Sequence, residues 1–172
     1  GGTPQLLLLR RRVLGDVRIE FTCRQDGHLN DLTCFAAARS EWGDGATPVR
    51  GGYEFKCGGF DNTRTCLYRA GQRLFDRRHQ PIIRGRSHQI VAQRIQGRLS
   101  LALDGEIIFD VVDPEPLSGS DRNALGLFGW EAETLISRIR ISVLAPPQVA
   151  DLGRLAYRHL GLGNYAVAQA LF

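Results

Sequence analysis

Lysine and dense positive charge are scarce in this sequence. Lys56 is the only lysine among 22 basic residues, and the net charge of the 172 residues is a modest +4. A nucleic-acid-binding domain more often concentrates basic residues on one face. Here the arginines gather only at residues 10–12 and 73–86, where solvated strand edges account for them. We therefore expect no nucleic-acid partner.

Long apolar runs are missing too. The run LLLL at residues 6–9 is far shorter than the roughly 20 residues that cross a bilayer as a helix. It is also shorter than the apolar part of a secretory signal peptide. We expect no membrane insertion, and a cytoplasmic location is favoured for this stretch of chain, although the sequence does not determine it.

Catalytic patterns are absent as well. The sequence has no G-x-S-x-G motif, no phosphate-binding loop and no kinase motif, and its four histidines lack the spacing of a zinc site. Glycoside hydrolases need two clustered carboxylates. Glu20 has no acidic partner two residues further along its predicted strand, and Glu131 and Glu133 fall in a predicted loop. We expect no catalytic residues in this chain and no enzymatic activity from it.

Calcium is the one cofactor for which the acidic residues offer candidate ligands. Asp104, Asp110, Asp113 and Asp121 are near one another in the sequence, but they form no D-x-D-x-D-G loop. A specific calcium site needs several oxygen ligands that converge on the ion. We expect no metal and no other cofactor, and calcium is the less favoured alternative.

Alternation of apolar and polar residues is the strongest pattern present. In DVRIEFTC, residues 16–23, Val17, Ile19 and Phe21 fall on one face of a strand and the polar residues fall on the other. About ten such segments follow one another, separated by turn residues. Because 43% of the residues are apolar, the chain can bury a core of its own. The pattern predicts an all-β antiparallel sandwich over residues 1–145.

The segment GRLSLALDGEIIFDVVDPEPL, residues 97–117, predicts a hairpin with two competing registers. A two-residue loop at residues 104–105 would place Leu99 opposite Asp110. A three-residue loop would place Leu99 opposite Phe109 instead, with the apolar residues of both strands on one face. Since a slip of one residue moves every side chain to the other face, we favour the three-residue loop.

The four cysteines allow two chemical states. Cys23 and Cys34 flank one predicted turn, and Cys57 and Cys66 flank another, so each pair would suit a cross-strand disulfide. A domain of this size does not need such links, and free cysteine is commonly buried. We favour four reduced thiols in the core and keep the two disulfides as the alternative.

The tail, residues 146–172, has a different period. After Pro146 and Pro147 the apolar spacing changes from 2 to about 3.6, which predicts a short α-helical hairpin as a second unit. LGRLAYRHLGLGNYAVAQALF resembles the first helical pair of a tetratricopeptide repeat. The matching positions are Gly163, Tyr165, Ala168 and Phe172. The resemblance implies protein partners, and the alternative is a lone helical cap on the sandwich.

The later part of the sandwich also resembles a known group. GRSHQIVAQRIQGRLSLALDGEIIFDVVDPEPLSG, NALGLFGW and LISRIRISV are similar to the later half of concanavalin A-like, laminin-G-like jelly rolls. The similarity covers roughly residues 14–144. GGYEFKCGGFDNTR, residues 51–64, looks most like the sandwich in non-catalytic regions of large bacterial serine/threonine kinases. The resemblance implies a jelly roll within a multidomain bacterial protein whose full length includes a kinase.

Two functions are consistent with these observations. The first is a non-catalytic ligand-recognition module for carbohydrate, in which Trp42 and Trp130 stack on sugar rings while Asp44 and Arg122 bind hydroxyl groups. For either tryptophan taken singly, a position covering the end of the core is the favoured alternative. The second is an architectural or protein-interaction module in a signalling protein. A glycoside-active enzyme is a distant third.

Overall fold

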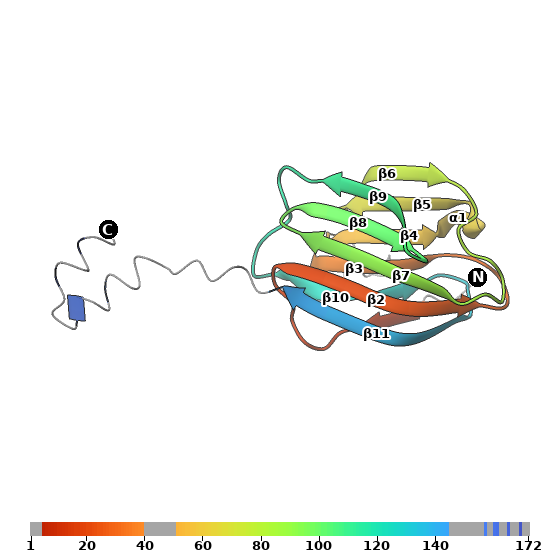
Figure 1. Ribbon diagram of the computed structural model, residues 1–172, viewed down its shortest axis with the longest axis horizontal. Coiled ribbons are helices and arrows are strands. Elements are labelled where there is room, and N and C mark those ends of the chain that lie inside the picture. Colours follow the sequence, from red (N-terminus) through yellow and green to blue (C-terminus); the bar gives the residue numbers. More distant parts are fainter. Residues whose placement is uncertain are drawn as a thin grey trace.

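The computed structural model describes residues 5–39 and 51–144, and in the tail only positions 157, 160, 161, 165 and 169. In these residues two antiparallel sheets lie face to face (Figure 1). The six-stranded sheet has the order β1 (Gln5–Leu8), β10 (Arg122–Gly129), β3 (Leu32–Arg39), β4 (Tyr53–Gly58), β5 (Arg64–Arg69) and β6 (Gln72–Arg78). The five-stranded sheet has the order β11 (Thr134–Leu144), β2 (Asp16–Gln25), β7 (His88–Ile95), β8 (Arg98–Leu103) and β9 (Glu106–Val112).

The predicted antiparallel sandwich is confirmed. A single short helical turn, α1 (Gly59–Asn62), interrupts the strands of the described ranges, and it follows β4 directly. No helix among the described residues is long and apolar enough to cross a membrane. The predicted helical hairpin at 146–172, and the boundary before it, lie outside the described residues apart from the five isolated positions.

Strand alternation builds the core between the sheets. On β2, Val17, Ile19 and Phe21 are at most 2% exposed and face the other sheet, as the sequence predicts. Each such side chain contributes about 1.5–3 kcal/mol by leaving water. β3 is buried on both faces, because Phe35 on its outer side packs with Phe128 in a second, smaller cluster.

The β8–β9 hairpin differs from the favoured prediction. Asp104 and Gly105 form a two-residue turn with φ of 51° and 86°, the left-handed values that a type I′ turn requires. A bulge within β9 then shifts the register by one residue. The observed pairs are Leu103–Glu106, Leu101–Phe109 and Leu99–Val111. The three-residue loop is therefore wrong, because a bulge rather than a longer loop brings the apolar residues to one face.

The cysteines are buried and free. Cys66 pairs with Lys56 across β4 and β5, so it faces the side of the sheet opposite to Cys57. Cys23 lies on β2 of one sheet and Cys34 on β3 of the other. Neither predicted disulfide pair is therefore a cross-strand pair. The favoured state, four reduced and buried thiols, agrees with the structure, although Cys66 faces away from the main core.

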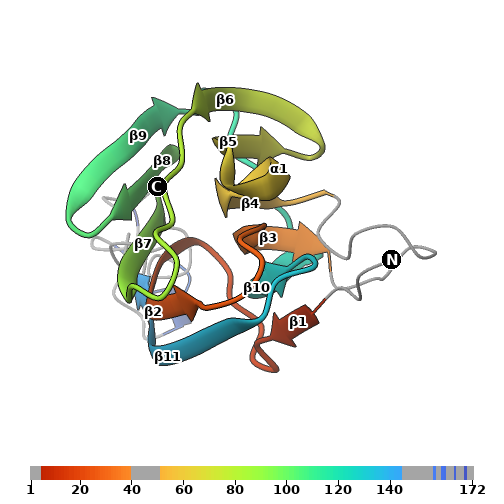
Figure 2. The same ribbon diagram turned by 90° about the vertical axis from the view of Figure 1, so that its right-hand side faces the viewer.

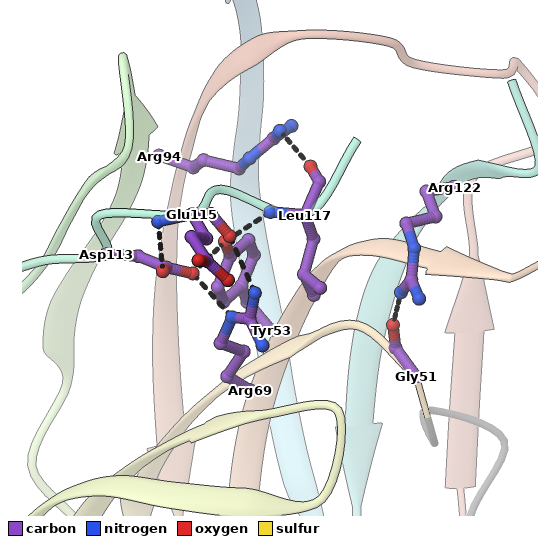
Figure 3. A network of polar contacts seen from close by, with 8 residues as sticks. All are labelled: Gly51, Tyr53, Arg69, Arg94, Asp113, Glu115, Leu117 and Arg122. Carbon is purple, nitrogen blue, oxygen red and sulfur yellow. Dashed lines mark hydrogen bonds and ion pairs between the residues drawn. The ribbon is translucent and has the colours of Figure 1, made fainter. Parts of the chain in front are cut away.

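A buried polar network closes one end of the sandwich (Figure 3). The Tyr53 hydroxyl donates to Asp113 Oδ2 at 2.6 Å and accepts from the Leu117 amide at 2.8 Å. Arg69 Nε donates to the same carboxylate at 2.7 Å, and Arg94 Nη2 donates to the Leu117 carbonyl at 2.6 Å. Since Tyr53 belongs to β4 and Arg94 to β7, the network ties both sheets to the loop that follows β9.

Candidate functional site

A left-handed turn after β4 shapes the opposite end of the sandwich. Gly58 has φ of 69°, and Phe60, Asp61 and Asn62 have φ of 56°, 56° and 58°. For residues other than glycine this conformation costs roughly 1–2 kcal/mol each. Three such residues in succession persist only where the surroundings enforce them, and strain of this kind clusters at ligand-binding sites.

Two asparagines hold the turn. Asn62, only 5% exposed, accepts from the Ile82 amide at 3.0 Å and donates to the Ile82 carbonyl at 2.8 Å. The Asp61 amide donates to Asn30 Oδ1 at 3.2 Å. These bonds offset the backbone strain. In this conformation Phe60 is 51% exposed at the rim.

A pocket of about 380 Å³ opens beside this turn. It is lined by Asn30, Asp31, Lys56, Phe60, Asp61, Phe128 and Trp130. The residues come from three separate stretches of the chain, which meet because Gly129 of β10 pairs with Leu32 of β3, and Leu32 pairs with Cys57 of β4. Figure 2 faces this end of the molecule, with α1 beside β4.

An ion pair forms the polar part of the pocket. Lys56 Nζ donates to Asp31 Oδ2 at 2.5 Å, and the two side chains are 16% and 11% exposed. Asp31 Oδ1 also accepts from the Thr33 hydroxyl at 3.1 Å. Lys56 Nζ lies 5.6 Å from the centre of the Phe60 ring. A charged donor and a charged acceptor are thus fixed side by side, next to an aromatic ring.

Two exposed aromatic side chains border this ion pair. Trp130 is 38% exposed and its ring centre lies 6.3 Å from that of the buried Phe128. Phe60 forms the other side, and the Arg64 guanidinium lies 5.6 Å from the Phe60 ring centre. Aromatic surface next to a few fixed polar groups is the composition typical of a small-ligand site. It suits a ligand with both apolar faces and hydroxyl groups.

The structure separates the residues that the sequence suggested for the site. Trp130 lines the pocket, whereas Arg122 lies at the other end of β10, roughly 23 Å from Gly129 at about 3.3 Å per residue. There the Arg122 guanidinium donates to the Gly51 carbonyl (Figure 3). Trp42 and Asp44 lie outside the described residues. Trp130 and Arg122 therefore cannot contact one sugar ring together.

Sequence reasoning missed Asn30, Asp31, Lys56 and Phe60. The sequence predicts only a turn between Cys57 and Cys66, and the left-handed backbone that displays Phe60 there has no distinct sequence pattern. The one available signal was that Lys56 is the sole lysine of the chain. Its partner Asp31 lies 25 residues away, so the pairing depends on the register of β3 and β4.

The aspartates considered for calcium do not converge. Each lies beside a different basic side chain: Asp104 beside His88, Asp110 beside Arg98, Asp113 beside Arg69 and Asp121 beside Arg39. In the part of the chain that the structure describes, no group of three or more His, Cys, Asp or Glu residues is placed to hold a metal ion.

The arrangement of the two sheets is that of the concanavalin A-like and galectin-like sandwiches. No family model matches the sequence, and no curated protein matches it. Among solved structures, the carbohydrate-binding module CBM66 from Bacillus subtilis is 12% identical, with 83% of each chain covered and a TM-score of 0.63. The potassium-bound carbohydrate recognition domain of Emp46p is 12% identical, over 84% of this chain and 80% of that one, with a TM-score of 0.65.

A protein of unknown function with a galectin-like fold from Bacillus subtilis is also similar. It is 9% identical, with 81% of this chain and 77% of that one covered and a TM-score of 0.62. At these identities the likeness is one of fold. The tetratricopeptide and kinase resemblances of the sequence remain predictions.

Proposed function

We propose that this sandwich is a non-catalytic carbohydrate-binding module and that a sugar ring occupies the pocket between Trp130 and Phe60. The proposal depends on one observation: two exposed aromatic side chains border a fixed Asp31–Lys56 ion pair in a single pocket. Carbohydrate recognition by two of the similar solved structures, as their names state, supports it. Trp42 and Asp44 remain candidates for additional contacts.

The chemistry of a sugar ring matches that of the pocket. One face of a pyranose or furanose ring presents C–H groups, which pack against the Trp130 ring. Neighbouring hydroxyl groups both donate and accept hydrogen bonds, so they suit Asp31 as acceptor and Lys56 as donor. Because that pair already holds its geometry through Thr33 and the Phe60 ring, little side-chain entropy is lost on binding.

A glycan array followed by calorimetry tests the proposal. Trp130→Ala removes the exposed ring and should weaken binding of every bound glycan by at least about tenfold, since an aromatic hot spot contributes 2 kcal/mol or more. Ile107→Ala, at a 62% exposed position of β9 in the other sheet, is the matched control and should bind like the original chain. Binding that survives Trp130→Ala unchanged would rule out this pocket.

A protein-interaction role is the second candidate. It is favoured by β11, an edge strand on which Leu135 and Val143 are 67% and 51% exposed. The tail, with its resemblance to a tetratricopeptide repeat, would add to this role within a multidomain parent such as a kinase. An array without bound glycans, together with a defined partner protein whose binding is lost on Leu135→Asp, would favour this role over carbohydrate recognition.

A further inference from the structure

A second pocket of about 410 Å³ lies next to the first one. The two pockets share Asp61, so the left-handed turn stands between them. Ile83 and Arg84 line the second pocket from the segment between β6 and β7, and His28 lines it from the loop between β2 and β3. The binding surface therefore continues past the space that one sugar ring fills.

The second pocket is lined by a basic residue, Arg84, that carries its positive charge. Four other basic residues near this end lie in ion pairs: Lys56 with Asp31, Arg64 with Asp76, Arg24 with Asp26 and Arg86 with Asp104. Arg84 is exposed, and within residues 5–39 and 51–144 it has no ion-pair partner. A free guanidinium offers two parallel N–H donors that match the oxygens of a carboxylate or sulfate group.

We infer that the second pocket binds an anionic group, a carboxylate or a sulfate ester, on the sugar unit next to the one held by Trp130. The ligand class is then an acidic oligosaccharide of at least two units, and the inference rests on the proposed function. Ile83, 52% exposed, contacts the ring of the second unit, and Arg84 pairs with its anionic group.

Asp61 is the one acidic side chain shared by both pockets. Its Oδ1 lies 3.1 Å from His28 Nε2, so the imidazole contacts this carboxylate at the boundary of the two pockets. Between two sugar units, the Asp61 carboxylate accepts hydroxyl hydrogens from either one. The bond from the Asp61 amide to Asn30 keeps this residue in place.

The experiment uses an array on which each acidic glycan stands beside an uncharged counterpart. Oligogalacturonides are paired with their methyl esters, sialylated lactosamine with lactosamine, and sulfated keratan fragments with unsulfated ones, so that carboxylate and sulfate are distinguished. Affinities of the bound pairs are then measured by calorimetry. The variants are Arg84→Gln and, as matched control, Arg11→Gln, an exposed arginine beside the distant end of β10.

At least one acidic glycan should bind about tenfold more tightly than its uncharged counterpart, which is about 1.4 kcal/mol. Arg84→Gln should remove this preference and Arg11→Gln should keep it, and added salt should weaken acidic ligands more than neutral ones. Trp130-dependent binding without a preference for acidic glycans, or a preference that survives Arg84→Gln, overturns the inference and leaves the proposed function standing. A chain that binds no glycan overturns both.

Discussion

The side chain of Asn62 forms two hydrogen bonds with the backbone of a single residue, Ile82, at 3.0 and 2.8 Å. This contact joins the left-handed turn after β4 to the segment that precedes β7. The turn borders the first pocket and the segment borders the second. Asn62 therefore acts as a positioning residue for both pockets, although its own side chain is buried.

Substitution of Asn62 tests that role. Asn62→Ala leaves the amide and carbonyl of Ile82 without partners and should lower the free energy of unfolding by about 2–4 kcal/mol, measured by urea denaturation. Asn62→Gly loses the same bonds but tolerates φ of 58°, so it should be about 1 kcal/mol more stable than the alanine variant. Both variants should weaken glycan binding. Equal stability of the two would mean that the left-handed backbone stores no strain.

The Asp31–Lys56 pair should show strong coupling between its members. Lys56→Met leaves the carboxylate of Asp31, 11% exposed, without its cation and should destabilise the fold by about 1–3 kcal/mol. Asp31→Asn together with Lys56→Met removes both charges and should cost less than the sum of the single changes. A double-mutant cycle should give a coupling of about 1–3 kcal/mol. Additive effects would place the pair in solvent rather than in a structured pocket.

Low pH should lower the stability of the sandwich through Asp113, which belongs to the polar network at one end. Burial by itself raises the pKa of Asp113, but hydrogen bonds from Tyr53, the Glu115 amide and Arg69 outweigh it, so its pKa lies below the ordinary value. A lowered folded-state pKa stabilises the protein above the unfolded-state pKa of about 3.9, and this stabilisation is lost as pH falls through the folded-state pKa. Urea midpoints measured from pH 5 to pH 2 should therefore fall.

The matched variant for this acid effect is Asp113→Asn. It should be less stable at pH 5 and should show a smaller decrease toward pH 2, because one of the titrating groups is gone. Part of the decrease should remain, since the pKa values of Asp104 and Asp110 are also lowered. An unchanged pH dependence would indicate that Asp113 is solvated in the folded chain.

The thiols should be unreactive in the folded protein. Burial raises the pKa of Cys23 and of Cys57 to about 12, and burial together with Asp76 raises that of Cys66 to about 11. Burial also raises the pKa of Cys34, and the thiolate is the reactive form. A thiol reagent at pH 8 should label none of the four cysteines in the folded chain and all four after denaturation without reductant. Fewer than four in the denatured chain would indicate disulfides.

The sequence by itself determined the local features of the sandwich. The alternation of Val17, Ile19 and Phe21 predicted which face of β2 is buried, because successive side chains of a strand point to opposite sides. Asp104 and Gly105 marked the tip of the β8–β9 hairpin, because both adopt left-handed φ readily. Trp130 was identified as a binding candidate because it is an aromatic residue of a predicted loop that can stack on a sugar ring, and it lines the pocket.

Only the tertiary structure decided which distant residues share a pocket. Phe60 and Trp130 border one pocket because the registers of β10, β3 and β4 align the ends of these strands. The bulge in β9 made the favoured hairpin register wrong. It shifts the pairing by one residue, so Leu101 and Phe109 are buried on one face although the turn has only two residues. Asn62 holds a left-handed turn through Ile82, 20 residues away. Such contacts depend on how separate segments pack, which no local pattern of residues encodes.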